Sequence, residues 1–303
     1  MQKLPDFLVV GPPKTASTSI YYYLSQHSEV FMSPRKETRF FDLHYAKGLN
    51  YYSEFFKERR SEKIAGEATP TYSFLPFVAG RIKHDLPNAK LIFCFRNPVE
   101  RAFSGWLMRS SKGNETLSFR EAMEKNLEQR QHIDFNNEEF EEVWLNDQKI
   151  LNKQNIITLR TYIEASTYAD QLKNYKKHFA AENIKILLLD DLKSDFRGTL
   201  LSLFEFLEVD TGVTSDIKSE VKNTYNKNRL RPLFNLVGKE IVFKAGRIIP
   251  KALRNKLNDV VKVKQDKPKI DKEDRAFAYG IFKNNIEELE KLLAKDLSAW
   301  KLF

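Results

Sequence analysis

The chain has 303 residues, of which 42% are apolar, so it can bury the core of one large domain or two smaller ones. No stretch of about 18 apolar residues occurs, and the first strand begins early, so we expect neither a transmembrane helix nor a signal peptide. A net charge of +9 suits an acidic cofactor, an acidic substrate or nucleic acid, and the single cysteine, Cys94, excludes intrachain disulfides and predicts a cytoplasmic protein.

Buried strands and amphipathic helices alternate along the expected secondary structure. Short apolar runs bounded by turn residues predict strands at 7–10, 30–32, 91–95 and 184–189. Helical spacing and capping residues predict a helix that ends at Leu24, a helix start at Ser118, and helices over 76–85, 98–109, 168–179, 200–207 and 271–300. This alternation predicts an α/β fold, with helices on both faces of a parallel sheet, as a single domain over 1–303. Within it, the basic stretch 222–269 is expected to form a mobile or helical surface segment.

The stretch DFLVVGPPKTASTS at 6–19 joins the first expected strand to a helix start through a tight turn. Backbone N–H groups without helix partners gather at such a start, and the helix dipole adds positive charge there. Lys14 adds a full charge, and the hydroxyls beside it can donate hydrogen bonds to phosphate or sulfate oxygens. The stretch is not a Walker A loop, because Pro13 precedes Lys14, which follows Gly11 by only three positions. A phosphate or sulfate cradle is predicted, and a polar turn with a surface lysine is the alternative.

A second strand end, at 95–104, carries an arginine and leads into another helix start. Asn97 is expected to cap that helix, with Glu100 as its capping-box partner. Ligands of open α/β sheets bind beyond the carboxyl ends of the strands, where Arg96 would present a forked donor suited to a terminal phosphate. Ser104 follows two helical turns after the cap, on roughly the same face. A capped helix with a surface arginine is the alternative.

Two acidic residues lie in polar stretches that could hold a general base. Glu37 belongs to SPRKETRFFD, where basic neighbours favour its ionised form, and Glu67 belongs to GEATPTYSF. A surface charge cluster is the alternative for Glu37, and a buried structural acid is the alternative for Glu67.

GPPKTASTS resembles the 5′-phosphosulfate-binding loop of PAPS-dependent sulfotransferases, usually written PKxGTT, with Ala16 in place of the glycine. RNPVERAFSGW resembles the 3′-phosphate-binding motif of the same family. The resemblance implies that Arg96 and Ser104 bind the 3′-phosphate of PAPS. It also implies a set of residues that hold the 5′-phosphosulfate, namely Lys14, Thr15, Ala16, Ser17, Thr18 and Ser19.

The acidic stretches resemble the heparan-sulfate-type branch of that family. There an acid shortly before a Phe-Phe pair is the general base, which implies this role for Glu37, while Glu67 is the second candidate. GEATPTY is similar to the EKTPxY segment, with Ala68 in place of a lysine that helps orient carbohydrate substrates. The basic loop that closes over the nucleotide is similar to 226–231, where Arg229 is implied as an extra 3′-phosphate contact.

Together these patterns predict a P-loop-like sulfotransferase that moves the sulfuryl group of PAPS to a hydroxyl or amine. No metal is expected, since the strand that would supply a magnesium ligand ends in Arg96. Ala68 and the cytoplasmic signature favour a small-molecule acceptor, as in bacterial natural-product tailoring, with no membrane partner. A nucleotide kinase and a non-catalytic nucleic-acid or anion-binding protein are the alternatives, although only the charge favours nucleic acid.

Overall fold

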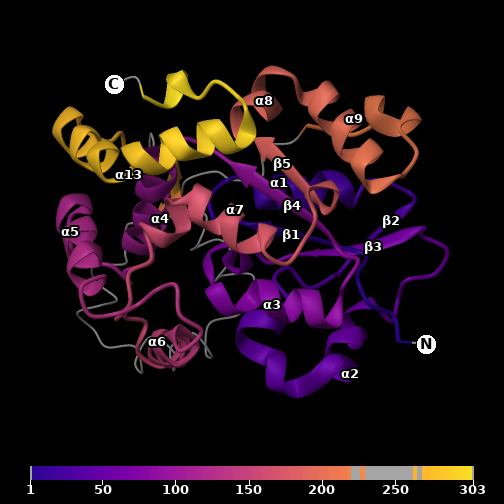
Figure 1. Cartoon of the computed structure of the whole chain (residues 1–303), viewed down its shortest axis with the longest axis horizontal. Helices are drawn as coiled ribbons and strands as arrows, with labels where there is room; N and C mark the ends of the chain where they lie inside the picture. Colours follow the sequence, from indigo (N-terminus) through magenta and orange to yellow (C-terminus); the bar gives the residue numbers. More distant parts are fainter. Residues whose placement is uncertain (1, 220–225, 229–261, 265–267, 302–303) are drawn as a thin grey trace.

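The computed structural model describes residues 2–219, 226–228, 262–264 and 268–301 (Figure 1). Its central sheet has five parallel strands in the order β2-β3-β1-β4-β5. The strands are β1 (Phe7–Gly11), β2 (Val30–Met32), β3 (Ile64–Ala68), β4 (Lys90–Phe95) and β5 (Ile184–Leu188). The predicted α/β class is therefore confirmed, and the strand missing from the prediction is β3. A short antiparallel pair, β6 (Asn226–Asn228) and β7 (Lys262–Lys264), lies outside this sheet.

Helices cover both faces of the sheet because successive strand side chains point to opposite faces. Phe7 and Val9 contact one apolar cluster, which includes α1 (Ser17–Leu24) and α9 (Phe196–Leu207). Leu8 and Val10 contact the other cluster. It includes side chains of α3 (Pro76–Asp85), α4 (Pro98–Ser111) and α7 (Tyr168–Lys176).

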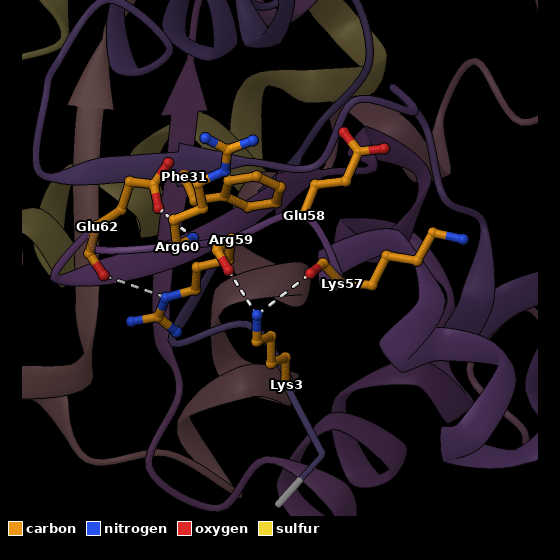
Figure 2. A pocket seen from close by; sticks show the side chains of 7 residues that line it. All are labelled: Lys3, Phe31, Lys57, Glu58, Arg59, Arg60 and Glu62. Carbon is orange, nitrogen blue, oxygen red and sulfur yellow. Dashed lines mark hydrogen bonds between the residues drawn. The ribbon is translucent and has the colours of Figure 1, made fainter.

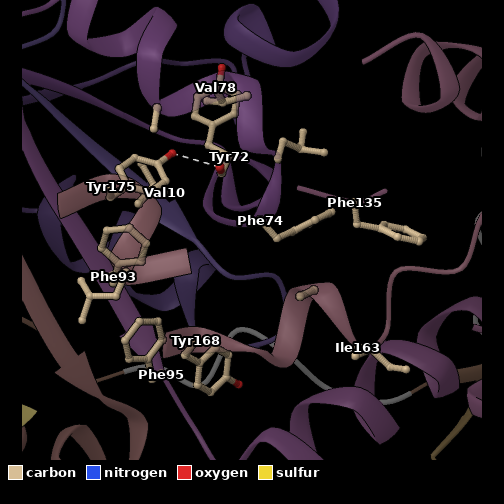
Figure 3. Packing of buried hydrophobic residues seen from close by; sticks show 14 of the residues in the cluster. Val10, Tyr72, Phe74, Val78, Phe93, Phe95, Phe135, Ile163, Tyr168 and Tyr175 are labelled. Atoms are coloured by element: carbon tan, nitrogen blue, oxygen red, sulfur yellow. Dashed lines mark hydrogen bonds between the residues drawn. The ribbon is translucent and has the colours of Figure 1, made fainter. Parts of the chain in front are cut away.

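Aromatic rings dominate the core on the α3 and α7 side (Figure 3). Phe95 at the end of β4 stacks on Tyr168 at the start of α7, with ring centroids 4.5 Å apart. Tyr175, which lies near the other end of α7, donates a hydrogen bond of 2.9 Å to the carbonyl of Tyr72. This packing fixes the carboxyl end of β4, from which Arg96 follows.

Two of the predicted helix caps form, and one predicted partner is wrong. Asn97 Oδ1 accepts hydrogen bonds from the backbone N–H groups of Val99 and Glu100, which begins α4. The Glu100 carboxylate does not complete a capping box, because it pairs instead with Arg96 and with Arg275 of the last helix. Ser118 and Glu121 do form the predicted capping box, at the start of α5 (Phe119–Gln129).

The other α-helices in the described part of the chain are α2 (Gly48–Ser53), α6 (Phe140–Gln154), α8 (Leu189–Ser194) and α13 (Lys272–Leu293). The last of these, yellow in Figure 1, packs on α4, α5 and α7 and ends earlier than predicted. A short turn, Ser298–Trp300, follows it, and the Trp300 carbonyl accepts a hydrogen bond from Asn97. Among the described residues, no helix combines the length and apolar composition that spanning a bilayer requires. Arg229 and most of 222–269 lie outside the described residues.

Candidate functional site

The turn between β1 and α1 is shaped by three residues with positive φ. Gly11 has φ +113°, and a Cβ there would lie 2.2 Å from the Pro70 carbonyl oxygen, so only glycine allows this approach. Lys14 (φ 73°) and Ala16 (φ 79°) adopt the left-handed conformation, which costs a non-glycine residue about 1–2 kcal/mol. Alanine thus adopts a left-handed conformation at the position where the PKxGTT motif has glycine. The chain turns tightly here, so that α1 begins just beyond the carboxyl end of β1.

The amino end of α1 has no side-chain cap and no local counter-charge. No side chain caps it, and its first turn holds no acidic residue, so the partial positive charge of the helix end is not neutralised locally. Thr18 and Ser19 are half-buried there, whereas Ser17 is buried. The buried Thr15 hydroxyl donates to the Pro12 carbonyl at 2.6 Å, so its proton holds the loop together. These features fit the 5′-phosphosulfate group that the sequence implies.

The second predicted motif lies directly beside the first because β4 is the neighbour of β1 in the sheet. Arg96 donates a hydrogen bond of 3.2 Å from Nη1 to the Lys14 carbonyl, and its Nη2 lies 3.6 Å from Glu100 Oε2. Ser104 lies on the buried side of α4 and is 8% exposed. The fold thus brings together the two predicted anion-binding stretches, whose residues Arg96 and Lys14 are 82 positions apart in sequence.

Glu67 lies at the end of β3, on the other side of β1, and is completely buried. Its Oε1 accepts a hydrogen bond from the Tyr52 hydroxyl at 3.1 Å, and its Oε2 accepts one from the Thr69 hydroxyl at 2.6 Å. Burial raises the pKa of Glu67 to about 7, although the surrounding hydroxyl donors oppose the shift. The carboxyl is therefore held inside the protein, under the segment that carries Glu37.

The stability of the folded protein should depend on pH through Glu67. The folded-state pKa of about 7 lies above the ordinary 4.5, so the folded state holds the proton more tightly. Below pH 4.5 the protonated Glu67 carboxyl contributes about 3 kcal/mol to the free energy of unfolding. This contribution is lost as the pH rises toward 7. Urea unfolding of the wild type and of Glu67→Gln at pH 5 and pH 8 measures this. The difference between the two proteins should change with pH by that amount, and parallel pH profiles would contradict the assignment.

Glu37 is more accessible, with a third of its side chain exposed. Its Oε1 lies 3.7 Å from the Lys36 ammonium. Burial lowers the pKa of Lys36, while the charges of Glu37 and Glu67 oppose that shift, so the ammonium lies within the field of both acids. The chain after Glu37 is fixed on η4 (Pro70–Phe74), since the Phe41 N–H donates to the Tyr72 hydroxyl at 3.1 Å. The two candidate bases therefore come from segments that pack on each other.

An ion pair between Arg39 and Asp42, which the sequence analysis did not single out, lies shortly after Glu37. The Arg39 guanidinium donates to Asp42 Oδ2 at 2.7 Å and lies over the Trp144 ring, 5.7 Å from its centroid. Thr71 donates to the same Asp42 oxygen. The spacing of Arg39 and Asp42, three residues apart, was the local signal for this pair, but its contact with α6 depends on the fold.

A hollow of about 560 Å³ lies beside the segments that precede β1 and β3, and none of the candidate site residues lines it (Figure 2). Lys3 donates there to the carbonyls of Lys57 and Arg59, and Arg59 also pairs with Asp6. These cations close the turn before β3. Because ligands of such sheets bind at the carboxyl ends of the strands, we assign this hollow a structural role.

The five-stranded parallel sheet and the two neighbouring basic strand ends define an α/β protein with a candidate site for a phosphorylated ligand. Residues 4–252 match the family described as "Sulfotransferase domain". The chain belongs to the PAPS-dependent sulfotransferase family. A solved structure of a sulfotransferase from Alicyclobacillus acidocaldarius superposes on this chain with a TM-score of 0.67. The two sequences are 25% identical, and the match covers 99% of this chain and 100% of the other.

The match to two curated relatives covers only part of each relative's own length. The "Membrane-associated sulfotransferase kil1" of Dictyostelium discoideum is 38% identical over 125 residues, which are 38% of this chain and 26% of that protein. The "Heparan sulfate glucosamine 3-O-sulfotransferase 3B1" of Mus musculus is 26% identical over 206 residues, 68% of this chain and 46% of the relative. The chain thus spans less than half the length of either relative.

Proposed function

We propose that this sulfotransferase uses PAPS to sulfate a hydroxyl or amine of a small-molecule acceptor, without a metal. The observation that carries the donor assignment is the hydrogen bond from Arg96 to the Lys14 carbonyl. It sets two cationic strand ends side by side, as a nucleotide with a phosphate at each end requires. Ser104 and the open end of α1 add uncharged donors to these two subsites.

The proposed mechanism assigns the two halves of the reaction, proton removal and departure of the leaving group, to different residues. When bound, PAPS supplies a sulfuryl group whose bond to the 5′-phosphate oxygen breaks as a new bond to the acceptor forms. Glu37 removes the acceptor proton, and Lys14 neutralises the charge that builds on the departing bridging oxygen. Ser17, Thr18, Ser19 and the backbone at Ala16 hold the 5′ end, so catalysis depends chiefly on position and charge.

A small acceptor is favoured by the side chain at position 68. Ala68 is buried in the apolar cluster beneath α1, so it offers no charge to an acidic polysaccharide. The EKTPxY segment that this stretch resembles has a lysine at the corresponding position. The proposal includes a cytoplasmic location, which the single, buried Cys94 favours.

Turnover with defined donors and acceptors tests the proposal. Purified protein is incubated with PAPS or ATP and with phenols, alcohols, amines or a desulfated heparan oligosaccharide, and PAP release is followed. PAP release that depends on a small acceptor is the expected result. Release only with the oligosaccharide would overturn the acceptor class, and turnover of ATP without PAPS turnover would overturn the donor.

Replacing Arg96 with alanine should chiefly weaken nucleotide binding. The loss of a charge-assisted contact to the 3′-phosphate is expected to cost roughly 2–4 kcal/mol of binding free energy. Calorimetry with PAP and with 5′-AMP, which lacks the 3′-phosphate, separates this effect from a general loss of structure. Equal binding of the two nucleotides by the wild type would contradict the roles of Arg96 and Ser104.

A further inference from the structure

Arg101 is a buried cation beside the proposed 3′-phosphate subsite. It lies on α4, three residues before Ser104, and is only 3% exposed. Its Nε donates to the Ser166 hydroxyl at 2.6 Å, and its Nη2 donates to the Tyr162 carbonyl at 2.7 Å. Both acceptors are uncharged. The guanidinium therefore has oriented donors but no neutralising charge in these bonds.

The described part of the chain offers Arg101 no ion-pair partner. Glu164 is an acid whose charge acts on it, but that carboxylate is already paired with Arg130 at 2.7 Å. Burial lowers the pKa of Arg101 to about 10, and the nearby positive charge of Arg96 acts in the same direction. A buried cation without a counter-charge is costly, so the arrangement favours an anion from outside the protein.

Tyr168 provides a second, independent feature at the same place. Its ring stacks on Phe95 and the residue is 1% exposed (Figure 3). Its hydroxyl donates to no acceptor in the described part of the chain. Burial raises the pKa of the Tyr168 hydroxyl, while the charges of Arg101 and Arg96 and the backbone N–H of Arg96 lower it, so both arginines act on this oxygen. A buried hydroxyl whose proton has no acceptor is costly, and a ligand oxygen would offset that cost.

We propose that Arg101 and Tyr168 form the inner part of the 3′-phosphate subsite, with Arg101 as a positioning charge and the Tyr168 hydroxyl as a further donor. This inference rests on the proposed use of PAPS. A 3′-phosphate carries two negative charges and several acceptor oxygens, so it can neutralise Arg96 and Arg101 together. The same features would discriminate against adenosine nucleotides that lack this phosphate.

Calorimetric titration of the full-length protein with PAP and with 5′-AMP tests the inference. Arg101→Met should weaken PAP binding about 10–100-fold and leave 5′-AMP binding within about twofold, because only PAP carries the 3′ charge. Arg101→Lys should recover most of the loss. Tyr168→Phe should weaken PAP binding about tenfold without lowering the melting temperature of the nucleotide-free protein.

Tyr175→Phe is the matched control, because that buried hydroxyl already has a partner, the Tyr72 carbonyl. It should lower the melting temperature and leave the ratio of the two affinities unchanged. An unchanged ratio in Arg101→Met overturns the inference alone, whereas a wild type that binds both nucleotides equally overturns the proposed donor as well. If Arg101→Met does not fold, an unchanged ratio of the two affinities in Tyr168→Phe overturns the inference.

Discussion

Turnover by the Glu37→Gln variant is expected to fall about 10²–10⁴-fold, the usual contribution of a general base. Glutamine has nearly the same shape but cannot accept the acceptor proton. Because a third of the Glu37 side chain is exposed and its main contact is the ion pair with Lys36, the melting temperature should change little. Single-turnover kinetics at saturating PAPS measures the chemical step, and calorimetry checks that PAP affinity is retained.

Glu67→Gln is the matched control for this experiment. Its side chain is buried among hydroxyl donors, so the substitution should alter the pH dependence of stability while the chemical step stays fast. A fast Glu37→Gln protein together with a folded but inactive Glu67→Gln protein would exchange the two roles.

Lys14→Ala is expected to lower turnover by about 10²-fold or more, since it removes a charge that stabilises the transition state. The backbone at position 14 has a positive φ, and alanine adopts this left-handed conformation at no greater energetic cost than lysine does. The melting temperature should therefore stay close to that of the wild type. Steady-state release of PAP measures the loss.

Lys47→Ala removes the same charge from an exposed position outside the site, so it controls for general electrostatic attraction of the nucleotide. Only the Lys14 variant should lose turnover. If the two variants behave alike, or if Lys14→Ala has the kinetics of the wild type, the loop does not stabilise the departing oxygen.

The sequence was sufficient for the class of fold and for placing the two predicted anion-binding stretches at the ends of strands. Both follow unbroken apolar strands, where the pattern is unambiguous, and the family motifs lie at the strand ends. The strand β3 escaped prediction because its sequence, IAGEA, has no apolar run. Gly66 is needed where a Cβ would lie 2.2 Å from the Phe7 ring, and Glu67 is tolerated because Tyr52 and Thr69 donate to it.

Long-range partners explain what else could not be predicted. The local pattern assigned Glu100 to a capping box, yet its carboxylate is taken by Arg275, which is 175 positions away. The unpaired charge of Arg101 is equally invisible in sequence, since it depends on which acids the fold brings near. Burial and charge pairing are properties of the assembled core rather than of any short stretch.

The hydrogen bond between Arg96 and the Lys14 carbonyl links the two ends of the proposed nucleotide site mechanically. A phosphate that orients Arg96 also fixes the carbonyl in the loop at the opposite end of the ligand. Free energies of binding for the two halves of the nucleotide should therefore be cooperative rather than additive, and each half should increase the affinity for the other by the same factor.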